Sequence, residues 1–140
     1  MSQNGIDAAI AALADDFALF SDWEERYAHV IELGRTLEPL SEAEHSEANK
    51  VRGCASQVWL VSEPRGGKLY FRGDSDAFIV RGLIAVLLSI FSGRTPREIQ
   101  AADPRAVFDS LGLASSLTPQ RSNGMIAMIE RMKREAAASA

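Results

Sequence analysis

The sequence of 140 residues contains a single cysteine, Cys54. One thiol excludes an internal disulfide, and it excludes the set of several thiolates that holds an iron–sulfur cluster. The absence of a disulfide framework fits a reducing compartment, so we expect a cytoplasmic protein. Cys54 also has no second thiol in the chain that would resolve an intermediate formed on it. Anything that this cysteine accepts must therefore pass to another molecule.

Long apolar runs and an excess of positive charge are also missing. The longest apolar stretch, residues 83–91, is interrupted by Ser89, and it is far shorter than the roughly 18 residues of a membrane span. The first five residues, Met-Ser-Gln-Asn-Gly, lack the basic start and the apolar segment of a signal peptide. A net charge of −4 argues against a nucleic-acid binder, whose surface is basic. We therefore expect no membrane and no nucleic acid as a partner.

Motifs for metals and phosphates are missing as well. His29 and His45 form no recognised zinc spacing with Cys54. The string Gly-Gly-Lys at residues 66–68 lacks the spacing and the hydroxyl of a phosphate-binding loop, and a turn explains it better. We therefore expect no metal site and no resident cofactor.

The length predicts one domain over residues 1–140, which buries enough surface to need no metal or disulfide. A first helix is indicated by apolar residues spaced by three and four, namely Ile6, Ile10, Leu13, Phe17 and Phe20. A capping box over residues 21–24 predicts a second helix that ends near Gly34, where glycine suits a left-handed cap. Its expected buried residues are Trp23, Tyr27, Val30, Ile31 and Leu33.

The middle of the chain predicts a loop followed by a hairpin. Residues 37–50 are polar and acidic, which indicates a surface loop that leads to Cys54. Residues 55–62 and 68–72 are rich in strand-forming side chains and flank a Pro-Arg-Gly-Gly turn signal. A third strand is expected over residues 47–53.

The second half of the chain predicts helices. Asp74 and Asp76 offer N-caps for a helix over residues 77–92, which is apolar nearly all round and is expected at the centre of the core. Proline and capping signals predict three more helices, over residues 95–98 and beyond, over 103–112, and from 118 onward. The tail, residues 136–140, is expected to fray. The basic residues Arg131, Lys133 and Arg134 are expected to interact with the dipole at the end of the last helix.

These elements together predict an α+β class. We expect a small antiparallel sheet of about three strands, with the helices packed on one side of it.

Cys54 lies where the predicted loop meets the predicted strand. Lys50 and Arg52 supply positive charge, which favours a thiolate. Gly53 permits a backbone turn and the close approach of another molecule. Two alternatives remain open at this level. A buried structural cysteine is the common case, and His45 is a candidate general base for a cysteine-dependent enzyme.

Five strings in collinear order carry a resemblance to a known family. They are Glu-Leu-Gly at 32–34, Asn-Lys-Val-Arg-Gly-Cys-Ala-Ser-Gln-Val-Trp at 49–59, Gly-Asp-Ser-Asp-Ala at 73–77, Ile-Val-Arg-Gly-Leu at 79–83 and Leu-Thr-Pro-Gln-Arg-Ser-Asn-Gly at 117–124. The sequence closely resembles the SufE family, of the SufE or CsdE type, over roughly residues 10–135. These are sulfur-acceptor proteins that partner cysteine desulfurases. The family is similar in fold to U-type iron–sulfur scaffolds, which carry several ligating cysteines.

The resemblance implies that Cys54 takes sulfur from a cysteine desulfurase of the SufS or CsdA type and becomes a persulfide. It also implies that the protein stimulates the desulfurase and delivers sulfur to an iron–sulfur scaffold complex. The pyridoxal phosphate belongs to the desulfurase. Arg121 matches the family's late arginine and is expected to face Cys54 and stabilise its thiolate or persulfide. Without the resemblance, a solvated surface arginine is the usual case. Arg52, Gly53 and Gln57 are expected to orient the loop or to contact the partner.

The apolar residues Val51, Val58 and Trp59 are expected to shelter the loaded sulfur, although burial raises a thiol pKa. We therefore expect a loop that holds Cys54 inward in the free protein and presents it on docking. A carrier needs only one docking face, so a monomer is expected. Two other functions stay open. One is a stand-alone enzyme that uses Cys54 with His45, and the other is an adaptor in which Cys54 is structural.

Overall fold

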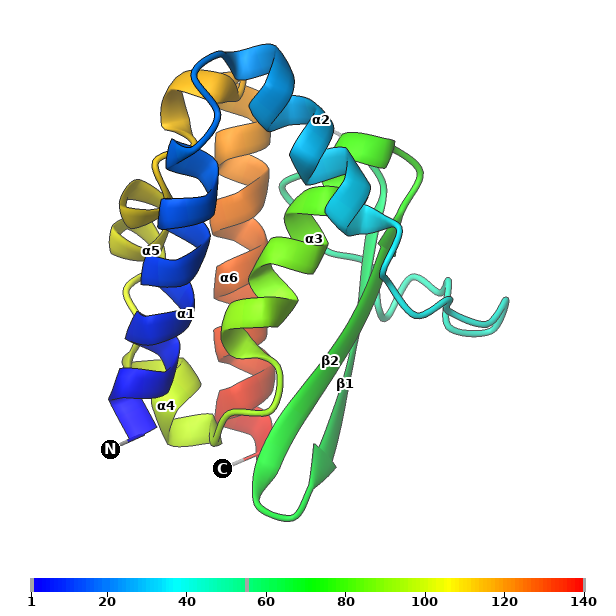
Figure 1. Ribbon diagram of the computed structural model, residues 1–140. Coiled ribbons are helices and arrows are strands. Elements are labelled where there is room, and N and C mark those ends of the chain that lie inside the picture. The colour runs from blue at the N-terminus through cyan, green and yellow to red at the C-terminus, as the bar shows by residue number, and fades with distance from the viewer. Residues whose placement is uncertain (1, 55, 140) are drawn as a thin grey trace.

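The computed structural model describes residues 2–54 and 56–139. The elements follow in the order α1 (Ser2–Ala18), α2 (Trp23–Gly34), β1 (Val58–Arg65), β2 (Lys68–Ser75), α3 (Phe78–Phe91), α4 (Pro96–Ala101), α5 (Pro104–Leu111), the 3-10 helix η1 (Ala114–Ser116) and α6 (Pro119–Ser139). Figure 1 shows the hairpin of β1 and β2 leaning against α3, with α1, α4, α5 and α6 on the other side of α3 and α2 crossing its upper part. The predicted α+β class is confirmed.

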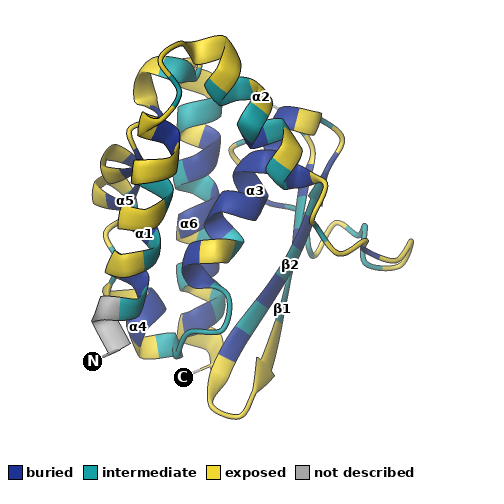
Figure 2. Cartoon of the chain, in the orientation of Figure 1, coloured by how far each residue is buried: buried dark blue, intermediate teal, exposed yellow. Residues whose placement is uncertain are grey.

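Helix α3 lies at the centre of the core, as its composition predicts. It contacts α1, α2, α6 and β2, and it appears dark blue along most of its length in Figure 2. Complete burial of a large apolar side chain stabilises the fold by about 1.5–3 kcal/mol, so this helix holds the surrounding layers together. Its buried residues are Ile79, Val80, Gly82, Leu83, Ile84, Ala85, Val86, Leu87, Ile90 and Phe91.

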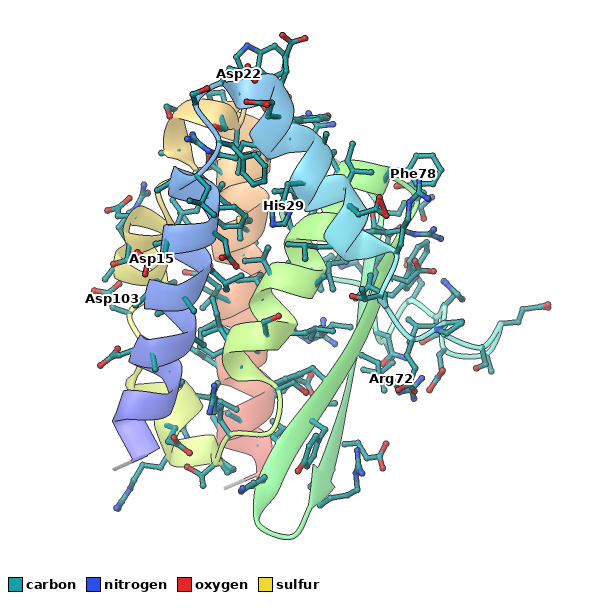
Figure 3. The ribbon with its side chains drawn as sticks, viewed as in Figure 1. Asp15, Asp22, His29, Arg72, Phe78 and Asp103 are labelled. Atoms are coloured by element: carbon teal, nitrogen blue, oxygen red, sulfur yellow. The ribbon has the colours of Figure 1, made fainter. Side chains whose placement is uncertain are left out.

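Two aromatic residues at helix starts are exposed rather than buried. Periodicity places Trp23 in the core, but 58% of its surface is exposed, and its ring packs edge-on against Tyr27 with the centroids 6.0 Å apart. Phe78 is 73% exposed, and Figure 3 shows its ring at the outer edge of the molecule. Each residue begins its helix, where the first turn extends beyond the neighbouring layer. The periodic pattern therefore overestimates burial at these two positions.

The capping signals predicted for α4 and α5 are confirmed, and that for α2 is shifted by one residue. The capping box at residues 95–98 and the cap of α5 at Asp103 are confirmed. The cap of α2 is Asp22 and not Ser21, because Asp22 Oδ1 accepts a 2.8 Å hydrogen bond from the backbone N–H of Glu25. The predicted box over residues 21–24 is therefore wrong by one residue.

The prediction that Asp74 and Asp76 cap α3 is wrong. Ala77 occupies the N-cap position and makes no side-chain capping bond. Asp74 instead lies between His45 and Arg81, with Oδ2 2.8 Å from His45 Nε2 and Oδ1 2.9 Å from Arg81 Nε. This carboxylate joins the long loop to α3 and does not start the helix.

The predicted hairpin forms, with its first strand shifted by three residues, from 55–62 to 58–65, and its second strand extended from 68–72 to 68–75. Its antiparallel register runs from Val58 opposite Ser75 to Arg65 opposite Lys68. The two glycines of the tip, residues 66–67, both have positive φ. This conformation matches the twist of paired strands and leaves Arg65 within the ladder.

The third predicted strand, over residues 47–53, is reduced to one bridge between Lys50 and Trp59. The described residues therefore form a two-stranded sheet and not a three-stranded one. Gly53, with φ of 88°, turns the chain away from the ladder directly after the bridge. Ala55, where the next strand was expected to begin, lies outside the described residues.

The loop between α2 and β1 projects from the body of the protein (Figure 1) and is tied back to β2 by an ion pair. The guanidinium of Arg72 donates to the carboxylate of Glu44, with Nη1 3.0 Å from Oε1. This hydrogen bond is the main reason that the pKa of Glu44 falls to about 2.

His45 provides a second tie between the same loop and β2. Its Nδ1 lies 2.8 Å from the carbonyl oxygen of Ser41, and its Nε2 lies 2.8 Å from Asp74 Oδ2. The ring packs edge-on against Trp59 with the centroids 4.7 Å apart. The hydrogen bond to Asp74 is the largest cause of a raised pKa at His45. The loop is therefore held most firmly when His45 is charged.

Two glycines bring α2 and α3 into backbone contact. A Cβ atom on Gly82 would lie 2.0 Å from the carbonyl oxygen of Val30, and one on Gly34 would lie 2.7 Å from the backbone nitrogen of Gly82. The predicted end of α2 at Gly34 is confirmed, but the predicted left-handed cap there is wrong, because the C-cap is Arg35 with a right-handed φ of −71°. Gly34 is required for the close crossing of the two helices.

Helix α6 differs from its prediction at its end. It continues to Ser139, and Ala136 is fully buried, so the described part of the tail does not fray, while residue 140 lies outside the described residues. No basic residue stands in the last turn, so the expected dipole contacts of Arg131, Lys133 and Arg134 are not formed. Neither α6 nor any other helix in the described residues combines the length and apolar character needed to cross a membrane.

Replacing Gly82 by alanine should destabilise the protein by about 3 kcal/mol, because the methyl group overlaps a backbone carbonyl that cannot move independently. Gly124→Ala is the matched control, since its Cβ would meet Cys54 Sγ at an ordinary 3.6 Å. Its unfolding free energy should stay within about 1 kcal/mol of the wild type. Chemical denaturation of both variants measures the difference. Equal stabilities would contradict the close crossing of α2 and α3.

The protection of the long loop should depend on pH through His45. The folded pKa is raised, so the stabilisation is complete below the unfolded value of 6.5 and is lost as the pH rises through the higher folded value. A suitable reporter is the amide of Leu60, which donates to the carbonyl of Asn49 at 2.8 Å. Its hydrogen-exchange protection, corrected for intrinsic exchange, should fall above pH 6.5 in the wild type. His45→Gln does not titrate and should lose this dependence, and an unchanged slope in that variant would contradict the assignment.

Candidate functional site

Cys54 lies in a short loop whose two ends are joined by backbone hydrogen bonds. The N–H of Val51 donates to the carbonyl of Val58 at 2.8 Å, which closes the loop at its base. The left-handed turn at Gly53 directs Cys54 toward α6. The thiol is partly buried, and its Sγ lies 3.7 Å from the carbonyl oxygen of Gly124. In Figure 1 this loop passes behind α3, near the end where α6 begins.

Cys54 opens into a pocket of about 100 Å³. The loop contributes the thiol and Ser56, α3 contributes an apolar wall, and the start of α6 contributes polar groups. The floor of the pocket is rigid because Val80, Leu83 and Met128 belong to the core. The complete lining is Cys54, Ser56, Val80, Leu83, Thr118, Gln120, Arg121, Gly124 and Met128.

Burial raises the pKa of the Cys54 thiol. The free protein therefore holds Cys54 as a thiol at neutral pH and not as a thiolate. The positive charge expected from Lys50 and Arg52 does not reach the pocket, since neither residue lines it. Both side chains approach Glu47, at 3.9 and 4.0 Å, and that of Arg52 is 76% exposed.

Arg121 lines the same pocket as Cys54. The first turn of α6 is fixed by a 3.2 Å hydrogen bond from the backbone N–H of Arg121 to Thr118 Oγ1. The Nε atom of Arg121 is buried and has no hydrogen-bond partner among the described residues. An unsatisfied buried N–H is unfavourable. The pocket therefore contains a donor that is free to bind an acceptor.

Gly53 and Gln57 hold the loop and do not line the pocket. A Cβ atom on Gly53 would lie 3.3 Å from that of Ala127, so the glycine lets the loop approach α6 closely. The backbone N–H of Gln57 donates to Asp76 Oδ1 at 3.1 Å. The Gln57 side chain is exposed, and so is Arg52, which leaves both accessible at the surface.

The apolar shelter differs from the predicted one. Val51 and Val58 are buried in the core, and Trp59 packs against His45. None of the three lines the pocket, whose apolar wall comes from α3 and α6 instead.

The alternative pairing of Cys54 with His45 is not formed. Both ring nitrogens of His45 are engaged, with Ser41 and Asp74, and His45 does not line the Cys54 pocket. A general base must lie within hydrogen-bond reach of the proton that it removes. His45 is therefore a tie for the loop and not the partner of the thiol.

Sequence reasoning missed the part of α6 that contacts the loop. Gly124 gives the thiol room, and Met128 closes the pocket. Gly124 stands within the matched string at residues 117–124, which was the available signal for its position. Arg131 carried no such signal. Its guanidinium donates to the carbonyls of Lys50 and Ala48 at 2.9 and 2.8 Å.

The described residues contain no cluster of three or more His, Cys, Asp or Glu side chains that would suit a metal ion. The chemistry that the pocket offers is that of one thiol, one free guanidinium donor and a small sheltered volume.

Comparisons with known proteins show the family of this chain. Residues 11–136 match the model of the SufE family, described as an Fe-S metabolism associated domain. An uncharacterized SufE-like protein of Rhizobium etli is 47% identical over 133 residues, covering 92% of this chain and 90% of that protein. One from Rhizobium meliloti is 48% identical over 128 residues, covering 89% and 91%.

A solved structure shares the fold. The solution structure of a hypothetical protein from Thermus thermophilus superposes on this chain with a TM-score of 0.76, at 18% sequence identity. The match covers 99% of this chain and 97% of the Thermus thermophilus chain. The family match spans the α2–α3 crossing, the Cys54 loop and the pocket-forming start of α6. This chain therefore belongs to the SufE family, whose domain is associated with iron–sulfur metabolism.

Proposed function

We propose that this protein carries sulfur as a persulfide on Cys54, between a cysteine desulfurase and the machinery that assembles iron–sulfur clusters. The observation that carries this proposal is the placement of the only cysteine. It lies in a small sheltered pocket beside an arginine whose buried Nε has no partner among the described residues. Membership of a family associated with iron–sulfur metabolism supports the same role.

The transfer step is an exchange at sulfur. The Cys54 thiolate attacks the outer sulfur of a persulfide on the desulfurase, and a new S–S bond forms at Cys54 Sγ. The S–S bond of the donor breaks, and its electron pair leaves with the desulfurase cysteine as a thiolate. The proton lost by Cys54 balances the charge on that leaving group. A second cysteine near Cys54 would displace the carried sulfur by forming a disulfide, so a single thiol suits a carrier.

The pocket has room for the cargo. A volume of about 100 Å³ exceeds the ~30 Å³ share of one water molecule in the liquid, so one additional sulfur atom fits beside Cys54. The apolar wall of Val80, Leu83 and Met128 limits the access of small reductants to that sulfur.

The same burial suppresses the nucleophile, because it raises the pKa of the Cys54 thiol. Docking of the desulfurase is therefore expected to move the loop and expose the thiol, which lowers the burial that opposes its ionisation. Exposed Arg52 and Gln57 flank the thiol and are placed to contact the partner.

Arg121 is placed to stabilise the anionic forms of the carrier. A persulfide is an acceptor for the Nε–H donor that lacks a partner among the described residues. A hydrogen bond from a charged donor stabilises its acceptor by about 1.5–3 kcal/mol.

Sulfur loading should depend strictly on Cys54. Incubation with a cysteine desulfurase and cysteine should add the mass of one sulfur atom to the wild type, as measured by intact mass spectrometry, and a reductant should remove it. Cys54→Ser should gain no mass because its hydroxyl is not nucleophilic enough toward sulfur. A reductant-sensitive gain in Cys54→Ser would contradict the carrier role of Cys54.

Arg121→Met should slow sulfur uptake by roughly tenfold or more, the effect of losing one charge-assisted hydrogen bond. It should also move the pH profile of Cys54 alkylation to higher pH, because the thiolate loses a nearby cation. Arg134→Met is the matched control, since it removes an exposed arginine from the same helix. Identical alkylation profiles for Arg121→Met and Arg134→Met would contradict this role of Arg121.

A further inference from the structure

We propose that Arg131 is a positioning residue for Cys54, which it holds against α6 by clamping the chain segment that leads into the Cys54 loop. The proposal extends the carrier function above and depends on it for its biological meaning. Arg131 does not line the pocket and acts only through the loop.

The clamp is formed by the two terminal nitrogen atoms of the Arg131 guanidinium group. Nη1 donates to the carbonyl oxygen of Lys50 at 2.9 Å, and Nη2 donates to that of Ala48 at 2.8 Å. Only 15% of the Arg131 side chain is exposed. A planar donor with fixed geometry loses little freedom in making two such bonds. Arg131 therefore fixes two carbonyls within six residues of the thiol.

The clamp is itself held in place by Glu135. Arg131 Nε lies 3.0 Å from Glu135 Oε2, and Glu135 Oε1 accepts a 2.7 Å hydrogen bond from Ser62 Oγ on β1. Burial alone would raise the pKa of Glu135, but hydrogen bonds from Ser62 and Arg131 outweigh it and keep the pKa below its usual range. The network therefore joins the loop, α6 and the first strand.

The residues that contact the loop lie on one face of α6. Arg121, Gly124 and Met128 line the pocket, and Arg131 and Glu135 continue the same spacing of three and four. The wall of the pocket and the clamp therefore belong to one rigid element. Release of the clamp loosens the segment that leads into the loop, while Val51 stays in the core and keeps the base of the loop closed.

Lys133 offers a matched control on the same helix. Its Nζ donates to the carbonyl oxygen of Ala102 at 2.7 Å, so it also ties α6 to a backbone carbonyl. That carbonyl lies between α4 and α5 and not in the Cys54 loop. Arg131→Met and Lys133→Met each remove a cation and keep an apolar stem, but only the first releases the loop.

The decisive measurement is the pH profile of Cys54 alkylation in the free protein. Arg131→Met should be alkylated about tenfold faster at neutral pH, the size expected for losing hydrogen bonds from a charged donor. Its profile should also move to lower pH, because a released loop buries the thiol less. Lys133→Met should match the wild type even if its melting temperature falls. A purely structural role for Arg131 would lower the melting temperature and leave the profile unchanged, and that result would overturn the proposal.

Arg131→Lys provides a second variant that keeps the charge and one donor. Its alkylation rate should lie between those of the wild type and Arg131→Met. If Arg131→Met does not fold, the test is whether Arg131→Lys is alkylated faster than the wild type. Equal profiles for Arg131→Lys and the wild type, together with a shift in Lys133→Met, would also overturn the clamp.

A separate measurement connects the clamp to the carrier function. After loading by a desulfurase, the persulfide on Arg131→Met should be lost to a small thiol reductant about tenfold faster than that on the wild type. An equal lifetime would show that the clamp does not protect the cargo. If the wild type takes up no sulfur, the carrier function fails, and the alkylation profiles still decide whether Arg131 positions Cys54.

Discussion

The seating of the Cys54 loop on α6 is the contact on which the candidate site depends. Gly53 makes it possible, because its left-handed φ of 88° turns the loop toward α6 and it places no side chain between the loop and the helix. Met128 and Met132 anchor this part of α6 in the core, where their side chains are almost completely buried. The position of one sulfur atom is therefore set by the packing of the whole protein and not by the loop alone.

The pocket combines two effects of burial that oppose each other. In the proposed carrier, the apolar wall that keeps reductants from the sulfur also raises the pKa of the thiol that must first accept it. In the same proposal, the buried donor of Arg121 acts in the other direction, because it favours a negative charge on sulfur. The proposed carrier is therefore protected but slow to react when it is free, and the partner that opens the site governs its reactivity.

The sequence predicted those features that depend on local signals. The buried character of α3, the glycine tip of the hairpin and the caps at Thr95 and Asp103 follow from residue pattern and were correct. Features that depend on tertiary contact were missed or misassigned. Gly34 was predicted to be a helix cap because no pattern within one helix reveals a crossing partner.

The site shows the same division. The string at residues 49–59 identified Cys54 and the string at 117–124 identified Arg121, and the structure brings both into one pocket. The apolar lining comes from α3 and α6, and neighbours of Cys54 in sequence do not contribute it. Arg131 was assigned to the helix dipole because the sequence does not indicate that α6 continues to Ser139. The hydrogen bond from Arg131 to the backbone carbonyl of Lys50, 81 residues away, cannot be inferred from the residues that neighbour Arg131 in the sequence.

The hairpin tip has a practical consequence. Its glycines, Gly66 and Gly67, have no atom within 4 Å of an added Cβ, and they lie at the end of the ladder opposite the Cys54 loop. The 8 residues of β1 separate the two ends by roughly 25 Å. A fluorophore-bearing or surface-tethering peptide inserted between the two glycines leaves the thiol unobstructed. The protein can then be immobilised for binding measurements, with the surface that carries the Cys54 loop facing the solution.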